Sequence, residues 1–288
     1  MRYTAQLHLS DALPPIGLLY VAEEFPDTDT TPALYEEHKL SIMLSDGLAA
    51  VLGSTVCRTV RGDLLVFRPD EIHFGRFFHP GVYRYIDFYI PPALTEALSD
   101  GCASLLQPFR DDAKDRVHHL RPPAELREQL LRLAEDAAAL SQSADPADGA
   151  VAYAKVLELL GLCRTLYAEQ KLHPVPDTVP AVVSHAIQTI TAEFARPLTL
   201  QSIAEKSGCS VSYLTRTFRR HTGKSVYAFL TEYRLLNARR ALENGASVTE
   251  ACYASGFGDC SDFIRIFREW DGRTPGRCRR DACGKVEK

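Results

Sequence analysis

The sequence has no long apolar run. No stretch of ~18 or more apolar residues, the length of a membrane helix, occurs among its 288 residues, and the first residues, MRYTAQLHLSD, lack the apolar segment of a signal peptide. The eight cysteines are scattered without a CxxC pair, which argues against a zinc knuckle and against a disulfide framework. We therefore expect a cytoplasmic protein with reduced thiols and no membrane partner.

Motifs of common enzyme classes are also missing. The sequence contains no nucleophilic triad pattern, no phosphate-binding glycine loop and no HExxH string. These absences favour a binding protein over an enzyme, with no cofactor.

Charge is distributed unevenly. Residues 1–179 carry 16 Lys and Arg against 26 Asp and Glu, a net charge of −10, whereas residues 180–288 carry 17 against 11, a net charge of +6. An acidic half repels a polyanion and a basic half attracts it, so the split indicates a nucleic-acid module joined to a part with another task.

The first 121 residues consist of short strand-like runs separated by Gly and Pro. Within RYIDFYI, alternation places Tyr83, Tyr85, Asp87 and Tyr89 on one face of a strand and Arg84, Ile86, Phe88 and Ile90 on the other. Several such strands predict a β-sandwich or β-barrel over residues 1–121.

Two helices and a linker follow. Apolar residues recur in helical spacing at Leu126, Leu130, Ala134 and Ala137, and a second helix is predicted from about Ala150 to Gln170. This helical element, residues 122–170, has two possible uses: it packs on the β domain, or it packs on a second copy of the chain as a dimerisation or relay element. Three prolines in KLHPVPDTVP predict a linker over residues 171–180.

The basic part, residues 181–288, is predicted to be all helical and to hold a helix-turn-helix. Thr199 is placed to cap a short helix, Gly208 to end it and Ser210 to cap the next one. On that next helix Val211, Leu214 and Phe218 fall on the inward face. The outward face carries small polar groups and guanidinium groups, which suit base edges and phosphates: Ser212, Thr215, Arg216 and Arg219.

A second unit repeats the first. Ser247 and Glu250 form a capping box, Gly256 supplies the turn and Asp259 caps the next helix, whose outward residues are Cys260, Ser261, Ile264, Arg265 and Arg268. The turn is expected to be longer here, because Ala204 precedes Tyr213 by nine residues while Cys252 precedes Phe263 by eleven. One such helix is as well explained by an ordinary charged surface, but two matching units favour DNA binding. A connecting helix of about 19 residues, from Ser225 to Gly245, would span roughly 28 Å, close to the ~34 Å between successive major-groove faces.

These strings carry a family resemblance. Residues 181–280 resemble the DNA-binding domain of AraC/XylS-type transcription regulators, on the strings LTLQSIAEKSGCSVSYLTRTFRRHTGKS, YRLLNARRAL, GFGDCSDFIRIFRE and GRTP. The resemblance implies double-stranded operator DNA as a partner. It also implies that Ser212, Thr215 and Arg216 meet bases while Arg219 lies nearer the backbone, with Cys260, Ser261, Ile264 and Arg265 in the corresponding places of the second unit. Asp262, Ile264 and Cys278 depart from the family pattern, so we expect the first unit to carry more hydrogen-bonded readout.

The N-terminal half is similar to a cupin-type sensor. EEHKLSIMLSDG and GDLLVFRPDEIH resemble the two cupin strand motifs, although only Glu36, His38 and His73 remain as metal ligands. A metal-free pocket is therefore expected, with a sugar or similar small metabolite as the effector. The candidate ligand-binding residues are Glu36, His38, Arg68, His73, Tyr83, Tyr85, Asp87 and Tyr89.

Together the sequence predicts an α+β protein with a cupin-like β-barrel, two following helices and an all-α domain with two helix-turn-helix units. The leading interpretation is a ligand-responsive transcription regulator that forms a homodimer and that, if it is an activator, contacts RNA polymerase. Two alternatives stay open: a metal-dependent cupin enzyme fused to a DNA-binding module, and an architectural DNA-binding protein without a ligand.

Overall fold

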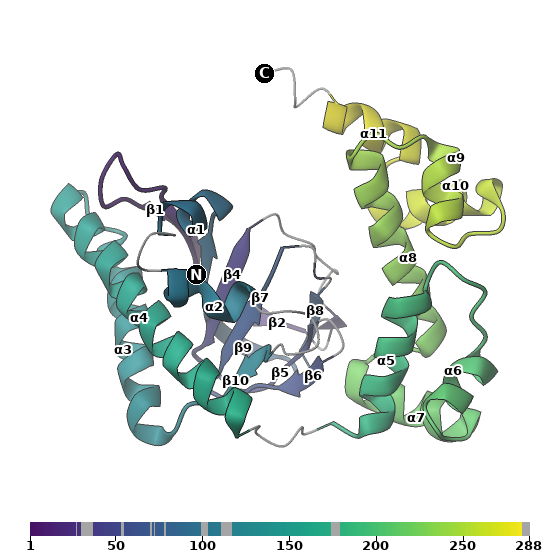
Figure 1. Cartoon of the computed structure of the whole chain (residues 1–288), viewed down its shortest axis with the longest axis horizontal. Helices are drawn as coiled ribbons and strands as arrows, with labels where there is room; N and C mark the ends of the chain where they lie inside the picture. Colours follow the sequence, from purple (N-terminus) through teal and green to yellow (C-terminus); the bar gives the residue numbers. More distant parts are fainter. Residues whose placement is uncertain are drawn as a thin grey trace. The chain divides into compact units, whose positions relative to one another are not determined.

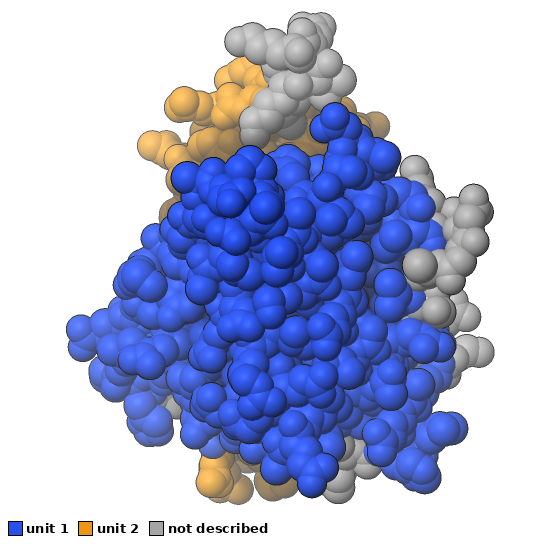
Figure 2. Space-filling model, turned by 90° about the vertical axis from the view of Figure 1, so that its left-hand side faces the viewer, with its two compact units in different colours: residues 1–52, 57–178 blue, residues 53–56, 179–288 orange. Residues whose placement is uncertain are grey.

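The computed structural model describes residues 1–26, 28–29, 37–52, 55–69, 71, 73–77, 79–98, 103–110, 117–173 and 179–283 (Figure 1). The chain divides into two compact units, residues 1–52 with 57–178 and residues 53–56 with 179–288 (Figure 2, blue and orange). The first unit holds β-sheets followed by helices and the second is all helical, which confirms the α+β prediction. Within these described stretches, no helix combines the length and the apolar character that crossing a membrane requires.

Two sheets form the β part. In order across the first sheet lie β1 (Arg2–Leu7), β2 (Ile16–Phe25), β9 (Gly81–Ile90), β4 (His38–Met43), β7 (Leu64–Phe67) and β10 (His119–Leu120), and neighbouring strands run antiparallel. The second sheet has the order β3 (Thr28–Asp29), β8 (His73–Phe77), β5 (Leu48–Leu52) and β6 (Thr55–Arg58).

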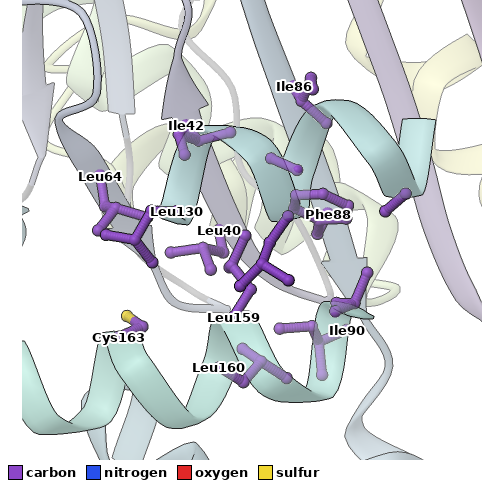
Figure 3. Packing of buried hydrophobic residues seen from close by; sticks show 14 of the residues in the cluster. Leu40, Ile42, Leu64, Ile86, Phe88, Ile90, Leu130, Leu159, Leu160 and Cys163 are labelled. Atoms are coloured by element: carbon purple, nitrogen blue, oxygen red, sulfur yellow. The ribbon is translucent and has the colours of Figure 1, made fainter. Parts of the chain in front are cut away.

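Two helices cover the outer face of the first sheet. These are α3 (Ala124–Leu140) and α4 (Pro146–Leu172), and the short α1 (Pro92–Ala97), η1 (Ala103–Leu106) and α2 (Gln107–Arg110) precede them. Figure 3 shows Leu130 of α3 and Leu159 of α4 among side chains from the sheet, in one apolar core that includes Leu40, Ile42, Leu64, Ile86, Phe88 and Ile90. Of the two uses left open for these helices, packing on the β domain is therefore the one observed. Helix α4 begins four residues earlier than predicted, because Asp145 caps it by accepting from Ala147 N and Pro146 occupies its first turn.

The strand alternation predicted for β9 is confirmed. Ile86, Phe88 and Ile90 belong to the core under the helices, whereas Tyr85 packs against a second apolar cluster. That cluster lies between the sheets, because it joins residues of β4 and β7 with residues of β5 and β6: Met43, Leu65, Phe67, Ala50, Leu52 and Cys57.

A buried ion-pair network ties β10 to the turn before β7. The Asp63 carboxylate is fully buried and accepts from His119 Nε2 at 2.6 Å, from Arg121 Nη2 at 3.0 Å and from Val60 N at 3.0 Å. Burial alone would raise the pKa of Asp63, but the hydrogen bonds from His119, Arg121 and Val60 hold that pKa below its ordinary 3.8. Burial alone would likewise lower the pKa of His119, yet its hydrogen bonds to Asp63 and Cys57 raise it to about 9.

The second unit consists of α5 (Ala181–Glu193), α6 (Leu200–Lys206), α7 (Val211–Thr222), α8 (Val226–Glu243), α9 (Val248–Ala254), α10 (Cys260–Asp271) and α11 (Pro275–Cys283). Side-chain caps explain where α6, α7, α8, α9 and α10 begin. Thr199 with Ser202, and Ser247 with Glu250, form capping boxes, while Ser210, Ser225 and Asp259 each accept from a backbone N–H of the first turn. Gly208 and Gly256, with φ of +68° and +81°, turn the chain between the two helices of each unit.

The second turn is longer, as predicted, but by one residue and not by the two that the residue counts suggested. Residues 207–210 separate α6 from α7, and residues 255–259 separate α9 from α10. The sequence comparison had matched Phe263 with Tyr213, but Tyr213 is exposed and the buried counterpart of Phe263 is Leu214.

Helix α8 is shared by the two helix-turn-helix units (Figure 1). The first half of α8 buries Val226, Phe229 and Leu230. Its second half contributes Leu235, Ala238 and Leu242 to the core of the second helix-turn-helix unit. Between these halves, Arg234 donates to the carbonyl oxygens of Phe194 (2.8 Å) and Arg196 (2.9 Å), just past the end of α5. The turn at Gly256 reaches the same place, because a Cβ atom there would lie 2.6 Å from Phe194 O.

The Asp63–His119 pair predicts an alkaline loss of stability. An unfolded histidine releases its proton near pH 6.5, whereas the pKa of folded His119 is about 9. The stabilisation is therefore complete below pH 6.5 and disappears as the pH rises through 9, a change on the order of 2–3 kcal/mol in the free energy of unfolding. Urea unfolding followed by circular dichroism between pH 6 and 10 measures it. In His119→Gln this component of the pH dependence should vanish, and a parallel profile in both proteins would contradict the assignment.

The two turn glycines provide a matched pair. In Gly208→Ala the only penalty is the left-handed backbone conformation of the alanine, because nothing lies within 4 Å of the added Cβ. The free energy of unfolding should fall by ~1 kcal/mol. Gly256→Ala adds a collision with backbone atoms of Phe194 and Ala195, so it should cost ~2 kcal/mol more. The single tryptophan, Trp270, lies in α10 and reports unfolding of this unit by fluorescence. Equal costs for both substitutions would refute the role given to the contact at Phe194.

Candidate nucleic-acid interface and effector site

Helix α7 presents the first predicted set to solvent. Ser210 caps it by accepting from Tyr213 N at 3.3 Å, and Gly223, with φ +80°, ends it. Leu214 and Phe218 are fully buried and fix the rotation of the helix. The four residues proposed to contact DNA are all exposed: Ser212, Thr215, Arg216 and Arg219.

Helix α10 is built in the same way. Asp259 caps it by accepting from Asp262 N at 2.8 Å, Gly272 ends it with φ +78°, and Phe263 and Phe267 are fully buried. Cys260 is half-buried, and the other residues of the predicted set are exposed: Ser261, Ile264, Arg265 and Arg268. The sequence therefore oriented both helices correctly, while the DNA contacts themselves remain a prediction.

The two helices differ in what surrounds their arginines. In the part of the chain that the structure describes, Arg216 and Arg219 form no ion pair. Arg265 lies between two carboxylates, with its Nη2 3.1 Å from Asp262 Oδ1 and its Nη1 3.3 Å from Glu269 Oε1. Near Arg216, the Thr215 hydroxyl donates to Val211 O at 2.8 Å, a bond within the helix.

The predicted effector residues do not form one group. Glu36 lies outside the described residues. His38 and Arg68 lie beside α2: the His38 ring is 5.2 Å from that of Phe109, and Arg68 donates to the carbonyl oxygens of Phe109 (3.1 Å) and Pro108. Arg68 is buried, and these hydrogen bonds hold the α2 backbone.

The remaining candidates lie on the facing sides of the two sheets, His73 on the second sheet and the others on the first. His73 of β8 packs its ring 4.5 Å from Phe67, and Tyr83, Tyr85, Asp87 and Tyr89 alternate along β9. Tyr83 has a structural role, since it is buried against Phe77 and donates to His79 O at 2.8 Å. Burial and the positive charge of Lys39 lower the pKa of His73 to about 3, which keeps this ring neutral.

Sequence reasoning missed two polar residues of this region, Lys39 and Ser41. Both are buried on β4, with Lys39 Nζ 3.5 Å from Asp87 Oδ2 and 3.9 Å from the centre of the Phe67 ring, and with the Ser41 hydroxyl donating to Asp87. The alternation of HKLSIM was the available signal, because Leu40 and Ile42 belong to the core under the helices and so place Lys39 and Ser41 on the opposite face.

Two of the three candidate metal ligands, His38 and His73, lie in different surroundings. Among the described residues, no three His, Cys, Asp or Glu side chains lie close enough to hold a metal ion together. His38 contacts Phe109 of α2, whereas His73 contacts Phe67 between the sheets. Burial, with the charges of Arg68 and Arg110, also lowers the pKa of His38 to about 4.

Comparison with known proteins supports the helix-turn-helix assignment. A family model described as a helix-turn-helix domain matches residues 203–281. The chain is 31% identical over 109 residues to the HTH-type transcriptional activator RhaS of Escherichia fergusonii, which covers 37% of this chain and 39% of that protein. It is 24% identical over 263 residues to the HTH-type transcriptional activator RhaR of an Enterobacter species, which covers 90% of both chains. A crystal structure of a probable AraC family transcriptional regulator from Rhodopseudomonas palustris is 29% identical, with a TM-score of 0.34, over 36% of this chain and 98% of that one.

The chain covers 31–39% of the length of the first curated relatives that it matches, and the family model matches within the helical unit. The relatives are named as regulators or activators of transcription. In its helical unit the chain is similar to helix-turn-helix transcription regulators, and it matches the activator RhaR over most of its length.

Proposed function

We propose that this protein regulates transcription by binding double-stranded operator DNA with α7 and α10, in response to a neutral small molecule held between its two sheets. One observation carries the DNA-binding part: two capped helices bury equivalent aromatic and leucine side chains and expose equivalent arginines, Arg216 and Arg265. Each lies six residues after its N-cap, so each takes the same place on a helix that a major groove can accommodate.

The residues divide into two roles. Ser212, Thr215 and Arg216 on α7, with Cys260, Ser261, Ile264 and Arg265 on α10, are proposed to face base edges. Arg219 and Arg268, one turn further along, are proposed to contact phosphates. RhaS and RhaR are named activators, and we propose that this chain also activates transcription. RNA polymerase would then be a further partner.

The effector is proposed to be a sugar or a similar polyol. Lys39 and Asp87 are buried and pair with each other, so a ligand that carries a net charge would leave an uncompensated buried charge. A neutral polyhydroxyl ligand can accept from the Lys39 ammonium and donate to the Asp87 carboxylate without that cost. His73, kept neutral, and Tyr85 are proposed to complete the site.

A homodimer is proposed through α4. This helix buries one side on the first sheet and leaves Val151, Ala154, Ala168 and Leu172 exposed, with Val151 at 48% and Leu172 at 77%. A second copy that brings the same helix would cover these apolar groups, and analytical ultracentrifugation of the full chain measures whether it does.

The base-reading role of Arg216 predicts a position-specific loss. A duplex selected by the full-length protein from a random-sequence library serves as the matched operator, and point mismatches are made in it. Arg216→Ala should cost ~1–3 kcal/mol on the matched duplex and relax discrimination at one base step. Arg219→Ala should weaken all duplexes uniformly and lower the salt slope by about one. Fluorescence anisotropy titration measures both, and an equal loss on matched and mismatched duplexes for Arg216→Ala would make it a phosphate contact.

The effector site predicts selectivity for neutral polyols. In a thermal-shift screen of the full chain, sugars or sugar alcohols should raise the melting temperature, whereas sugar phosphates and sugar acids should not. Tyr85→Phe removes one hydroxyl and should weaken binding of the neutral ligand by about tenfold, the worth of one hydrogen bond, with little change in the melting temperature of the free protein. Stabilisation by anionic sugars alone would reject this site.

A further inference from the structure

We infer that Asp262 and Glu269 are specificity-determining residues, which hold Arg265 in place for base readout and reduce binding of α10 to non-matching DNA. This inference rests on the proposed DNA binding and adds to it a division of labour between the two helices. No role for either carboxylate follows from capping or from the core, because both side chains lie on the exposed face of α10.

The geometry joins three exposed side chains along one face. Asp262, Arg265 and Glu269 follow each other at spacings of three and four residues, which places them side by side on a helix. The two terminal nitrogens of Arg265 contact different carboxylates: Nη2 lies 3.1 Å from Asp262 Oδ1, and Nη1 lies 3.3 Å from Glu269 Oε1. The side chains are 59–69% exposed, and exposed ion pairs contribute little to folding stability. We therefore expect the two ion pairs to orient the Arg265 side chain and to offset its positive charge.

The first helix provides an internal comparison. Arg216 and Arg265 each stand six residues after an N-cap and seven before a left-handed glycine, Gly223 or Gly272. In this register Asp262 corresponds to Tyr213, and Glu269 corresponds to Arg220. On α10 both positions that flank Arg265 are therefore acidic, whereas on α7 the positions that flank Arg216 hold an aromatic and a basic residue.

This difference gives the two helices unequal electrostatics. The exposed face of α7 carries Arg216, Arg219 and Arg220 and has no acidic residue in its first turn, so it attracts any phosphate backbone. On α10 the charges of Asp262 and Glu269 offset those of Arg265 and Arg268. Helix α10 therefore gains little from an arbitrary sequence.

At a matching site the same carboxylates assist binding. A restrained guanidinium loses less conformational freedom when it donates to the O6 and N7 atoms of guanine. Asp262 also has a second oxygen that can accept from the amino group of a neighbouring cytosine. At a mismatched site Arg265 cannot turn toward a phosphate without leaving both carboxylates, so the penalty for a wrong base increases.

A structural role for Asp262 is the competing explanation. It is the third residue of α10, where a negative charge interacts favourably with the helix dipole. Glu269 lies two turns further on and has no such role. If the two carboxylates act through Arg265, substitutions at both positions change DNA discrimination in the same direction, whatever they do to the stability of the helix.

The experiment compares Asp262→Asn and Glu269→Gln in the full-length protein, on the selected duplex and on versions mismatched under α10. Glu243→Gln is the matched control, because Glu243 pairs with Arg239 at 3.0 Å and the same i,i+4 spacing on α8. At low salt, both test variants should bind the mismatched duplex at least about threefold more tightly, because each removes one negative charge near the phosphates. Their affinity for the matched duplex should change less. Melting temperature, followed by Trp270 fluorescence, is recorded for each variant.

The outcomes separate the two proposals. A fall in the ratio of matched to mismatched affinity in both variants, but not in Glu243→Gln, supports the inference. An equal change on all duplexes, or the same change in Glu243→Gln, overturns it while leaving operator binding intact. An effect of Asp262→Asn alone, accompanied by a lower melting temperature, assigns that residue to the helix terminus and also overturns it. If the unaltered protein shows no sequence preference in the selection, the proposed function itself fails.

Discussion

The relation between the two helix-turn-helix units depends on how Arg234 holds the end of α5. The last carbonyl groups of a helix have no partner within it, and here Arg234 supplies one to Phe194 O and Arg196 O from the middle of α8. A positive charge at a helix C-terminus is also favourable. Since Gly256 packs against the same carbonyl, the turn of the second unit, the end of α5 and the middle of α8 meet at one point. This contact joins the two helix-turn-helix units in addition to the shared helix α8.

Sequence reasoning succeeded for features that are local in the chain. The N-caps at Thr199, Ser210, Ser225, Ser247 and Asp259 act within three residues, so their side chains and spacing predict where each helix begins. The buried Leu214 and Phe263 follow from helical periodicity. Arg234 could not be recognised in this way, because its partners lie 38 and 40 residues away and are carbonyl groups that carry no sequence signal. The length of the second turn was misjudged by one residue because Tyr213 was taken as the counterpart of Phe263, although helical periodicity places Leu214 on the inward face.

The β domain was less accessible to sequence reasoning. Alternation in β9 predicted two faces, but it could not decide which face α3 and α4 would cover, and the two open uses of these helices left the same question unresolved. Arg68 and His73 were both predicted to line one pocket, but Arg68 donates to a carbonyl oxygen of α2 and His73 packs on Phe67 between the sheets. Lys39 escaped notice because a lysine is rarely buried. Its burial becomes acceptable only with Asp87, a partner 48 residues away.

Charge acts on this protein at two scales in the same sense. The first 179 residues carry a net charge of −10 and the remainder +6, so most of the chain is repelled by DNA while the helical unit is attracted. On α10 the acidic Asp262 and Glu269 beside Arg265 repeat that balance within one helix. A regulator must find one site among a large excess of other sequences, and each charge that strengthens binding to any phosphate backbone also strengthens binding to all of them. Acidic groups near the interface lower that common contribution, and hydrogen bonds to base edges are then left to decide where the protein stays bound.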